Sequence, residues 1–260
     1  MPSHLRCENV TVRFGGLVAC NHVNLDVEEG RIVGLIGPNG AGKTTLFNVL
    51  SRFQDAQSGE LYYRDQSISR RKPHEMISIG LARTFQNINL FREQSTLDNI
   101  LIGAHRRMAD PFGAMYSLPY ARRRERENVQ HATEIAELLN LSAELDTAAK
   151  NLPYGSQKRV ELARALAAQP KIILLDEPVA GCNEDETAEL RSIVKRINRE
   201  FGITILLVEH DMSMVMSVCD YIYVINFGAN LADGTPEQIR ANPEVIRAYL
   251  GEAETEDVNS

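Results

Sequence analysis

Apolar and polar residues alternate near the start of the chain. Residues 5–12 and 23–27 both show the alternation of half-buried strands, and a Gly-Gly pair marks the turn between them. Residues 32–36 form a short apolar run that ends in a glycine-rich loop, and residues 43–50 have the spacing of a helix. This part of the sequence therefore predicts an antiparallel strand pair and then a strand–loop–helix unit, with a further strand over 59–63.

The middle of the chain has a different character, because strand patterns disappear between Asn87 and Pro153. Residues 121–139 are polar and helical, and four apolar residues are spaced for one buried face: Ala132, Ile135, Leu138 and Leu139. We expect this stretch to form a helical subdomain inserted into the rest of the fold.

Helices and strands alternate again after Pro153. The pattern predicts helices over 156–168 and 184–200, short buried strands over 172–175 and 203–208, and a hairpin over 221–232. Strands that alternate with helices imply a mostly parallel sheet. The predicted fold class is α/β, with an antiparallel β-part at the N-terminus, a parallel core sheet and a helical insertion. The residues after Gly251 are acidic and polar, which favours a loose tail.

Composition narrows the function classes. Hydrophobic residues make up 43% of the 260 residues and charged residues 24%, the balance of a soluble globular protein. The net charge of -7 argues against a general nucleic-acid binder, which needs a basic face. Its 4 cysteines form no C-x-x-C pair, so neither zinc nor redox chemistry is indicated. We see no signal peptide and no apolar run of the roughly 18 residues that a membrane helix needs. We expect a cytosolic protein, held at a membrane only through another chain.

The loop after the apolar run 32–36 has the pattern of a phosphate-binding loop. The sequence Gly37-Pro38-Asn39-Gly40-Ala41-Gly42-Lys43-Thr44 fits G-x-x-x-x-G-K-[ST]. Glycines let successive N–H groups point into one concavity that receives phosphate oxygens, and the dipole of the following helix favours the anion. Lys43 is predicted to reach the β- and γ-phosphates, and the Thr44 hydroxyl to ligate Mg²⁺. We expect ATP to be bound by Asn39, Gly40, Ala41, Gly42, Lys43, Thr44 and Thr45.

Two carboxylates follow the buried strand 172–175. Ligands bind beyond the C-terminal ends of parallel strands, which is where Asp176 and Glu177 stand. Asp176 is placed to hold Mg²⁺ through water, and Glu177 is placed to polarise the attacking water as general base.

The segment Pro153-Tyr154-Gly155-Ser156-Gln157 resembles the signature motif of ATP-binding-cassette proteins, whose common form is Leu-Ser-Gly-Gly-Gln. Gly155 and Gln157 match it, Tyr154 stands at the place of the serine, and Ser156 at the place of the second glycine. Ser156 lies where a helix is expected to begin, which makes it a candidate N-cap, a candidate phosphate donor, or both.

Other residues follow in the order of that family. Phe14 resembles the aromatic that stacks on adenine, and Gln86 the glutamine that contacts Mg²⁺ and the attacking water. Asn183 occupies the D-loop, where aspartate is commoner, and His210 resembles the switch histidine that reads the γ-phosphate. Glu184 departs from the proline often seen after the D-loop residue.

A narrower resemblance is to the ATPase subunit of branched-chain amino-acid importers, the Liv type. It is carried by Arg83-Thr84-Phe85-Gln86, Pro153-Tyr154-Gly155, Ala180-Gly181-Cys182-Asn183, Glu209-His210-Asp211-Met212, Gly234-Thr235-Pro236-Glu237-Gln238-Ile239-Arg240 and the segment 242–251. The resemblance implies one cassette domain over 1–260. Its nucleotide-binding core comprises 1–86 and 154–250, its helical subdomain comprises 87–153, and a flexible tail comprises 251–260.

The same resemblance implies the partners. Two cassettes, identical or different, would sandwich two ATP molecules, and the signature segment of each would meet the nucleotide of the other. Two transmembrane permease subunits would bind at the surface 86–101, with Leu90 and Phe91 as candidate contacts or as core residues of the helical subdomain. A solute-binding protein would take part indirectly, and the chain would lie at the cytoplasmic face of the membrane.

Two alternatives to the importer, and the role of one basic cluster, remain open from the sequence. One is a cassette ATPase of a lipid or polysaccharide exporter, which would share every catalytic residue. Another is a cassette ATPase acting on DNA or ribosomes, although the net charge and the single cassette argue against nucleic acid. Finally, the basic cluster Arg122-Arg123-Arg124 with Arg126 reads as a solvated helix face, or as a contact with lipid headgroups.

Overall fold

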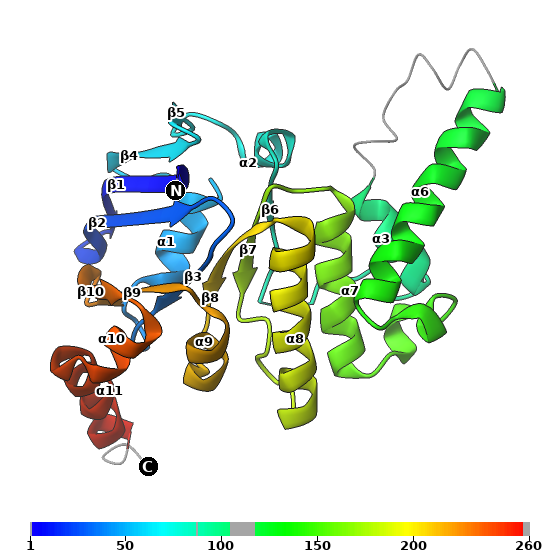
Figure 1. The fold of residues 1–260 in the computed structure, drawn as a ribbon. Coiled ribbons are helices and arrows are strands. Elements are labelled where there is room, and N and C mark those ends of the chain that lie inside the picture. Colours follow the sequence, from blue (N-terminus) through cyan, green and yellow to red (C-terminus); the bar gives the residue numbers. More distant parts are fainter. Residues whose placement is uncertain (1, 87, 105–117, 257–260) are drawn as a thin grey trace.

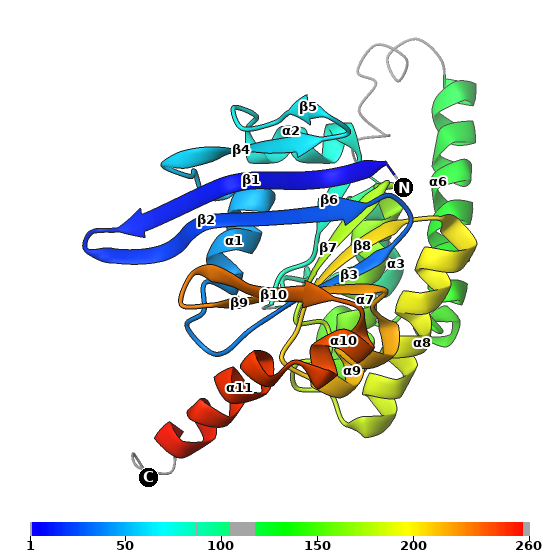
Figure 2. The same ribbon diagram turned by 60° about the vertical axis from the view of Figure 1, so that its left-hand side comes forward.

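A computed structural model describes residues 2–86, 88–104 and 118–256 of the chain. It contains two sheets with helices between and around them (Figures 1 and 2). The first sheet is antiparallel and has the strand order β2-β1-β4-β5. Its members are β1 (Ser3–Phe14), β2 (Leu17–Glu28), β4 (Ser58–Tyr63) and β5 (Gln66–Ser67).

The second sheet is mostly parallel and has the order β10-β9-β3-β8-β7-β6. β3 pairs in parallel with β8 and β9, β7 pairs in parallel with β6 and β8, and only β10 runs antiparallel, to β9. The strands are β3 (Ile32–Ile36), β6 (Leu81–Arg83), β7 (Ile172–Asp176), β8 (Thr204–Val208), β9 (Tyr221–Asn226) and β10 (Ala229–Gly234). The predicted parallel core sheet is therefore confirmed, with β6 as a strand that the sequence pattern did not show.

The helix α1 (Lys43–Leu50) lies between the two sheets (Figure 1). Its Leu46 and Phe47 side chains are fully buried in a core that also receives side chains from β1, β2, β3 and β8. α1 begins directly after the phosphate-loop pattern, so the loop lies where the layers meet.

A second core covers the opposite face of the parallel sheet. It is formed by α7 (Tyr154–Ala167), α8 (Glu184–Phe201) and α9 (Met212–Val218), with α3 (Thr96–Gly103) and α6 (Leu118–Leu138) packed on α7. The approach of α3 to α7 is close, since a Cβ atom at Gly103 would lie 2.0 Å from the Arg164 carbonyl oxygen. The described part of the chain also contains the helices α2 (Pro73–Met76), α10 (Pro236–Ala241) and α11 (Pro243–Glu256) and the 3-10 turns η1 (Ile77–Ile79), η2 (Ser142–Glu144) and η3 (Ala149–Asn151).

The inserted stretch is helical where it is described. In the ranges 88–104 and 118–153 the named elements are α3, α6, η2 and η3, and the structure shows no strand there beyond one isolated bridge. α6 and α11 project from opposite ends of the molecule (Figure 2). On α6, Arg123 is highly exposed and pairs with Glu127, as a solvated helix face does, while the side chain of Arg122 lies outside the described part.

Two boundaries differ from the sequence prediction. α7 begins at Tyr154 with Pro153 as its N-cap, so the prediction of Ser156 as N-cap is wrong. Tyrosine and glycine have low helix propensity, which moved the predicted start two residues late. α11 continues to Glu256 where a loose tail from 251 was predicted, because the added residues include the good helix formers alanine and glutamate. Residues 257–260 of that predicted tail lie outside the described ranges.

Candidate functional site

The phosphate-loop segment is shaped by glycine. Gly42, the N-cap of α1, has φ 100°, and a Cβ atom there would lie 2.2 Å from the Ala19 carbonyl oxygen of β2. A side chain is excluded at that position both by conformation and by space. The turn delivers Lys43 to the first position of α1, where its ammonium donates to the carbonyls of Gly37 at 2.6 Å and Pro38 at 2.7 Å. The lysine is thus held against its own loop, buried, while Thr44 beside it is exposed.

A cavity of about 920 Å³ opens beside this loop. The loop forms one wall, and the hairpin β9–β10 and α11 form the other. The lining residues are Pro38, Asn39, Gly40, Ala41, Asn226, Phe227, Leu231, Glu244, Arg247 and Ala248. The predicted adenine platform, Phe14, lies elsewhere, at the end of β1, with 49% of its surface exposed.

Asp176 ends β7 and is paired with a buried arginine that the sequence did not single out. Arg83, the last residue of β6, donates to the Asp176 carboxylate at 2.9 Å, and both side chains are under a tenth exposed. Burial raises the pKa of Asp176, and the guanidinium opposes that rise. Arg83 also donates to Asn48 and Ser51, each at 2.7 Å. The arginine therefore joins the end of β7 to the helix that follows the phosphate loop.

The three predicted catalytic residues come together next to Asp176. The Gln86 side-chain amide donates to the Glu177 carboxylate at 2.8 Å, and His210 Nδ1 lies 3.9 Å from the other Glu177 oxygen. Glu177 has φ 47°, a left-handed conformation that is rare for residues with a side chain. Its N–H donates to the Val208 carbonyl at 2.9 Å, which fixes this turn to the end of β8. Strain of this kind is typical of functional sites.

Glu209 is a second residue that sequence reasoning missed. Its carboxylate is fully buried and accepts hydrogen bonds from three backbone N–H groups, those of Val179 at 3.0 Å, His210 at 3.0 Å and Asp211 at 3.2 Å. Burial raises the pKa of Glu209, and these N–H donors act in the other direction. Glu209 thereby holds the turn that carries His210 against the turn that follows Glu177. The sequence signal that could have identified Glu209 is a carboxylate placed between an apolar strand and a histidine.

Lys158 connects the same centre to α7. Its ammonium is buried and donates to the carbonyl of Gln86 at 3.1 Å, and it lies 3.5 Å from the carbonyl of Glu177. The helix that starts with the signature-like segment is therefore anchored to the two residues that meet at the end of β7.

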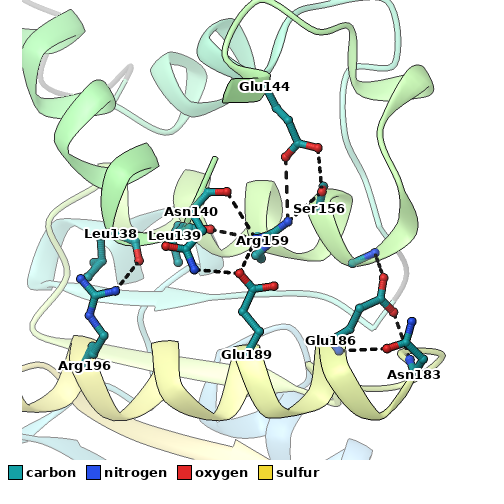
Figure 3. Close-up of polar contacts among 11 residues, drawn as sticks. Leu138, Leu139, Asn140, Glu144, Ser156, Arg159, Asn183, Glu186, Glu189 and Arg196 are labelled. Carbon is teal, nitrogen blue, oxygen red and sulfur yellow. Dashed lines mark hydrogen bonds and ion pairs between the residues drawn. The ribbon is translucent and has the colours of Figure 1, made fainter. Parts of the chain in front are cut away.

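The signature-like residues lie in the first turn of α7 and contact α8, the loop before it, and the helical region. Figure 3 shows the contacts of this turn with Glu144 and Glu186. The Tyr154 hydroxyl donates to the Ala180 carbonyl at 3.2 Å, and the Gly155 N–H donates to Glu186 at 3.1 Å. The Ser156 hydroxyl is buried and donates to Glu144 at 3.0 Å. Gln157 donates its side-chain amide to the Leu152 carbonyl at 2.9 Å. Asn183, the remaining predicted residue of this region, is the N-cap of α8.

A glycine-rich loop before a helix between two sheets, with an acidic strand end beside it, is the arrangement of a nucleotide-hydrolysing cassette. Residues 20–180 match the ABC transporter family, and residues 229–255 match the family described as branched-chain amino acid ATP-binding cassette transporter. The chain belongs to the ABC transporter family and is an ATPase of that family.

Particular relatives cover nearly the whole chain. The high-affinity branched-chain amino acid transport ATP-binding protein BraF of Pseudomonas aeruginosa is 47% identical over 96% of this chain and 98% of its own length. The protein LivG of Escherichia coli K12, with the same description, is 45% identical over the same shares. A crystal structure of the ADP conformation of an ATP-binding cassette is 34% identical, with a TM-score of 0.85, over 96% of this chain and all of that one. In the described ranges, no helix combines the length and apolarity needed to cross a membrane.

Proposed function

We propose that this chain energises a membrane importer for branched-chain amino acids, working at the cytoplasmic face of the membrane. The match over 229–255 and the branched-chain amino acid transport of the relatives BraF and LivG support the substrate class. An exporter cassette would share the catalytic residues but gives no reason for that C-terminal match. For a cassette acting on nucleic acid, the net charge of -7 is unfavourable.

The observation that carries the catalytic proposal is the meeting of Gln86, Glu177 and His210 beyond the end of β7. Glu177 takes the proton of the attacking water as general base. Gln86 orients the water and the Glu177 carboxylate, and His210, which lies beside Glu177, contacts the γ-phosphate in this proposal. Lys43 leaves the loop carbonyls that now hold it and neutralises the β- and γ-phosphates. Phe14 contacts the adenine ring in this proposal.

The residues present fit a Mg²⁺ ion, which prefers oxygen ligands. Thr44 offers an exposed hydroxyl at the start of α1. Because the Gln86 nitrogen donates to Glu177, its carbonyl oxygen is the atom left for a cation. Asp176 supplies a carboxylate that is already placed by Arg83. When bound, the ion would neutralise phosphate charge during transfer.

A second cassette, identical or different, completes the site in this proposal. Tyr154, Gly155, Ser156 and Gln157 form a turn that, together with Asn183, builds the surface presented to the nucleotide of the partner, with the positive end of the α7 dipole directed at the γ-phosphate. ATP then holds the two cassettes together, and hydrolysis releases them. A solute-binding protein takes part only through the permeases.

Two transmembrane permease subunits receive this motion through the surface 86–101. Phe91 is 54% exposed there, which supports it as a contact. Leu90 is partly buried and packs on the core, so its role is to support that surface. On α6, the exposed Arg123 pairs with Glu127, which favours the solvated-face interpretation of the basic cluster.

The test is reconstitution. The chain is co-purified with its permeases and partner cassette, placed in vesicles, and supplied with ATP, leucine and the solute-binding protein. We expect ATP-dependent leucine uptake that Glu177→Gln stops. Hydrolysis with no uptake of any branched-chain amino acid would reject the substrate class, and a salt-dependent shift of DNA would favour the nucleic-acid alternative.

A further inference from the structure

A single carboxylate, that of Glu186, ties the first turn of α7 to the loop before α8 (Figure 3). Its Oε1 atom accepts a hydrogen bond from the Gly155 N–H at 3.1 Å, and its Oε2 atom accepts one from the Asn183 N–H at 3.0 Å. One side chain therefore spans the two segments that resemble the signature motif and the D-loop.

Helix capping explains only half of this arrangement. Asn183 is the N-cap of α8, and its Oδ1 accepts from the Glu186 N–H at 2.9 Å, while Glu186 returns the contact to the Asn183 N–H. This reciprocal pair is a capping box, and it needs one carboxylate oxygen. The second oxygen accepts its hydrogen bond from α7, and this contact plays no part in capping α8.

On α7, the space that the Glu186 carboxylate occupies is free because residue 155 is glycine. A Cβ atom at Gly155 would lie 2.4 Å from Glu186 Oε1, so a side chain at position 155 would displace the carboxylate. A second link lies beside it, because the Tyr154 hydroxyl donates to the Ala180 carbonyl at 3.2 Å. Packing continues at Gly181, where a Cβ atom would lie 3.0 Å from the Tyr154 ring. Two separate contacts thus hold the start of α7 against residues 180–183.

We propose that Glu186 is a positioning residue for ATP hydrolysis, which fixes the signature turn and the D-loop of one chain relative to each other. The two segments then reach the nucleotide of the partner cassette as one rigid unit. This inference rests on the proposed function, in which both segments act on the facing nucleotide. The Glu186 carboxylate is engaged within its own chain, so it acts through the geometry of Gly155 and Asn183 and not by touching phosphate.

Glu186→Gln is the variant that tests the link. Glutamine is also accepted in a capping box, but its amide has one oxygen, and its NH₂ group would face one of the two N–H donors. The variant therefore keeps either the cap or the link to Gly155. In the assembled transporter, we expect kcat for ATP hydrolysis to fall about tenfold, since small displacements of positioning groups are costly, with KM for ATP within about twofold. Asp185→Asn, an exposed neighbour of the same charge, should behave as wild type.

Two results of the single variant would overturn the proposal. One is a wild-type kcat for Glu186→Gln. The other is a loss of activity accompanied by a lower melting temperature of the protein or by weaker ATP binding to the isolated chain. Either change would show that the role of Glu186 is merely structural. The double variant with Tyr154→Phe should lower kcat by more than the product of the two single losses, because both contacts hold the same segments. Losses of kcat that simply multiply would also contradict the proposal. Lys43→Ala in the same preparation tests the ATPase site itself, so failure of the proposed function is seen separately.

Discussion

The two regions that the proposed reaction uses are built in different ways. In the phosphate-loop region, the chain positions its own reacting groups. Lys43 is held by loop carbonyls, Asp176 by Arg83, and Glu177 by Gln86, and both Lys43 and Asp176 are buried. The groups that would touch phosphate and water are already held in place, Lys43 by its own loop and Asp176 and Glu177 each by a residue from another segment of the chain.

The first turn of α7 shows the opposite arrangement. Tyr154 is 44% exposed, yet the polar groups behind it are bound within the chain, the Gly155 N–H to Glu186 and the Ser156 hydroxyl to Glu144. These contacts shape a surface; they do not assemble reacting groups. Substitutions in the phosphate-loop region should therefore stop the reaction, and substitutions around the first turn of α7 should slow it or loosen the fold.

Lys43→Ala should have the largest effect. The variant removes the cation that neutralises the β- and γ-phosphates, and we expect weakened ATP binding and no measurable hydrolysis by the assembled transporter. Isothermal titration with ATP and a phosphate-release assay measure the two effects. Lys150→Ala, which removes an exposed lysine paired with Glu93, is the matched control and should leave both unchanged. Hydrolysis near the wild-type rate in Lys43→Ala would contradict the contrast between the two regions.

Glu177→Gln should come second. The glutamine oxygen can still accept the hydrogen bond from Gln86, so the shape of the site is kept while the base is lost. We expect ATP to bind and kcat to fall by ~10²–10⁴-fold, with a closed cassette pair accumulating on size-exclusion chromatography. Glu184→Gln, an exposed acid at the start of α8, provides the control. Unchanged turnover would assign the base to another residue.

The sequence predicted the central elements closely because their signals are local. The apolar run 32–36 and the helix 43–50 coincide with β3 and α1, since a fully buried strand and a glycine loop mark their own ends. β6 escaped prediction because it has three residues and ends in the charged Arg83. The start of α7 was placed late because Pro153 caps a turn whose first residues are poor helix formers.

The residues of the site likewise divide into those with a local sequence signal and those without one. Gln86, Glu177 and His210 were predicted from motifs, and the fold gathers them because neighbouring parallel strands end at one edge. Arg83 and Glu209 were not predicted, since their roles depend on partners distant in sequence, such as Asp176 for Arg83 and Val179 for Glu209. The same holds for Glu186, whose contact with Gly155 no local pattern shows.

Arg159→Met should have a smaller effect, and on stability. The Arg159 guanidinium is mostly buried and donates to Glu189 at 2.6 Å and to the carbonyls of Leu139 and Asn140 at 3.4 and 3.3 Å (Figure 3). Its loss leaves the end of α6 without these bonds, which we expect to cost about 2 kcal/mol in the free energy of unfolding. Urea titration measures this cost.

Arg123→Met is the matched control for that prediction, because Arg123 makes an exposed pair on the same helix, α6. Such pairs contribute about 0–1 kcal/mol. ATP affinity of the isolated chain should be unchanged in both variants, since neither residue touches the phosphate loop in its described contacts. Equal urea midpoints for the two variants would show that Arg159 does not hold the helical region to α7 and α8.

Ser156→Ala should have the smallest effect, and its size distinguishes two roles. Ser156 is 3% exposed, and its hydroxyl donates to Glu144 at 3.0 Å and accepts from Arg159 at 2.9 Å. A hydroxyl that donated directly to the transition state would be worth ~10²–10³-fold in turnover. One that shapes the turn from within should be worth only several-fold, and we expect that result, with unchanged ATP affinity of the isolated chain. Glu144→Ala removes the same hydrogen bond from its other end, so the double variant should be no slower than the slower single variant. A hundredfold loss in Ser156→Ala alone would instead place this hydroxyl at the partner's phosphate and remove the contrast between the two regions.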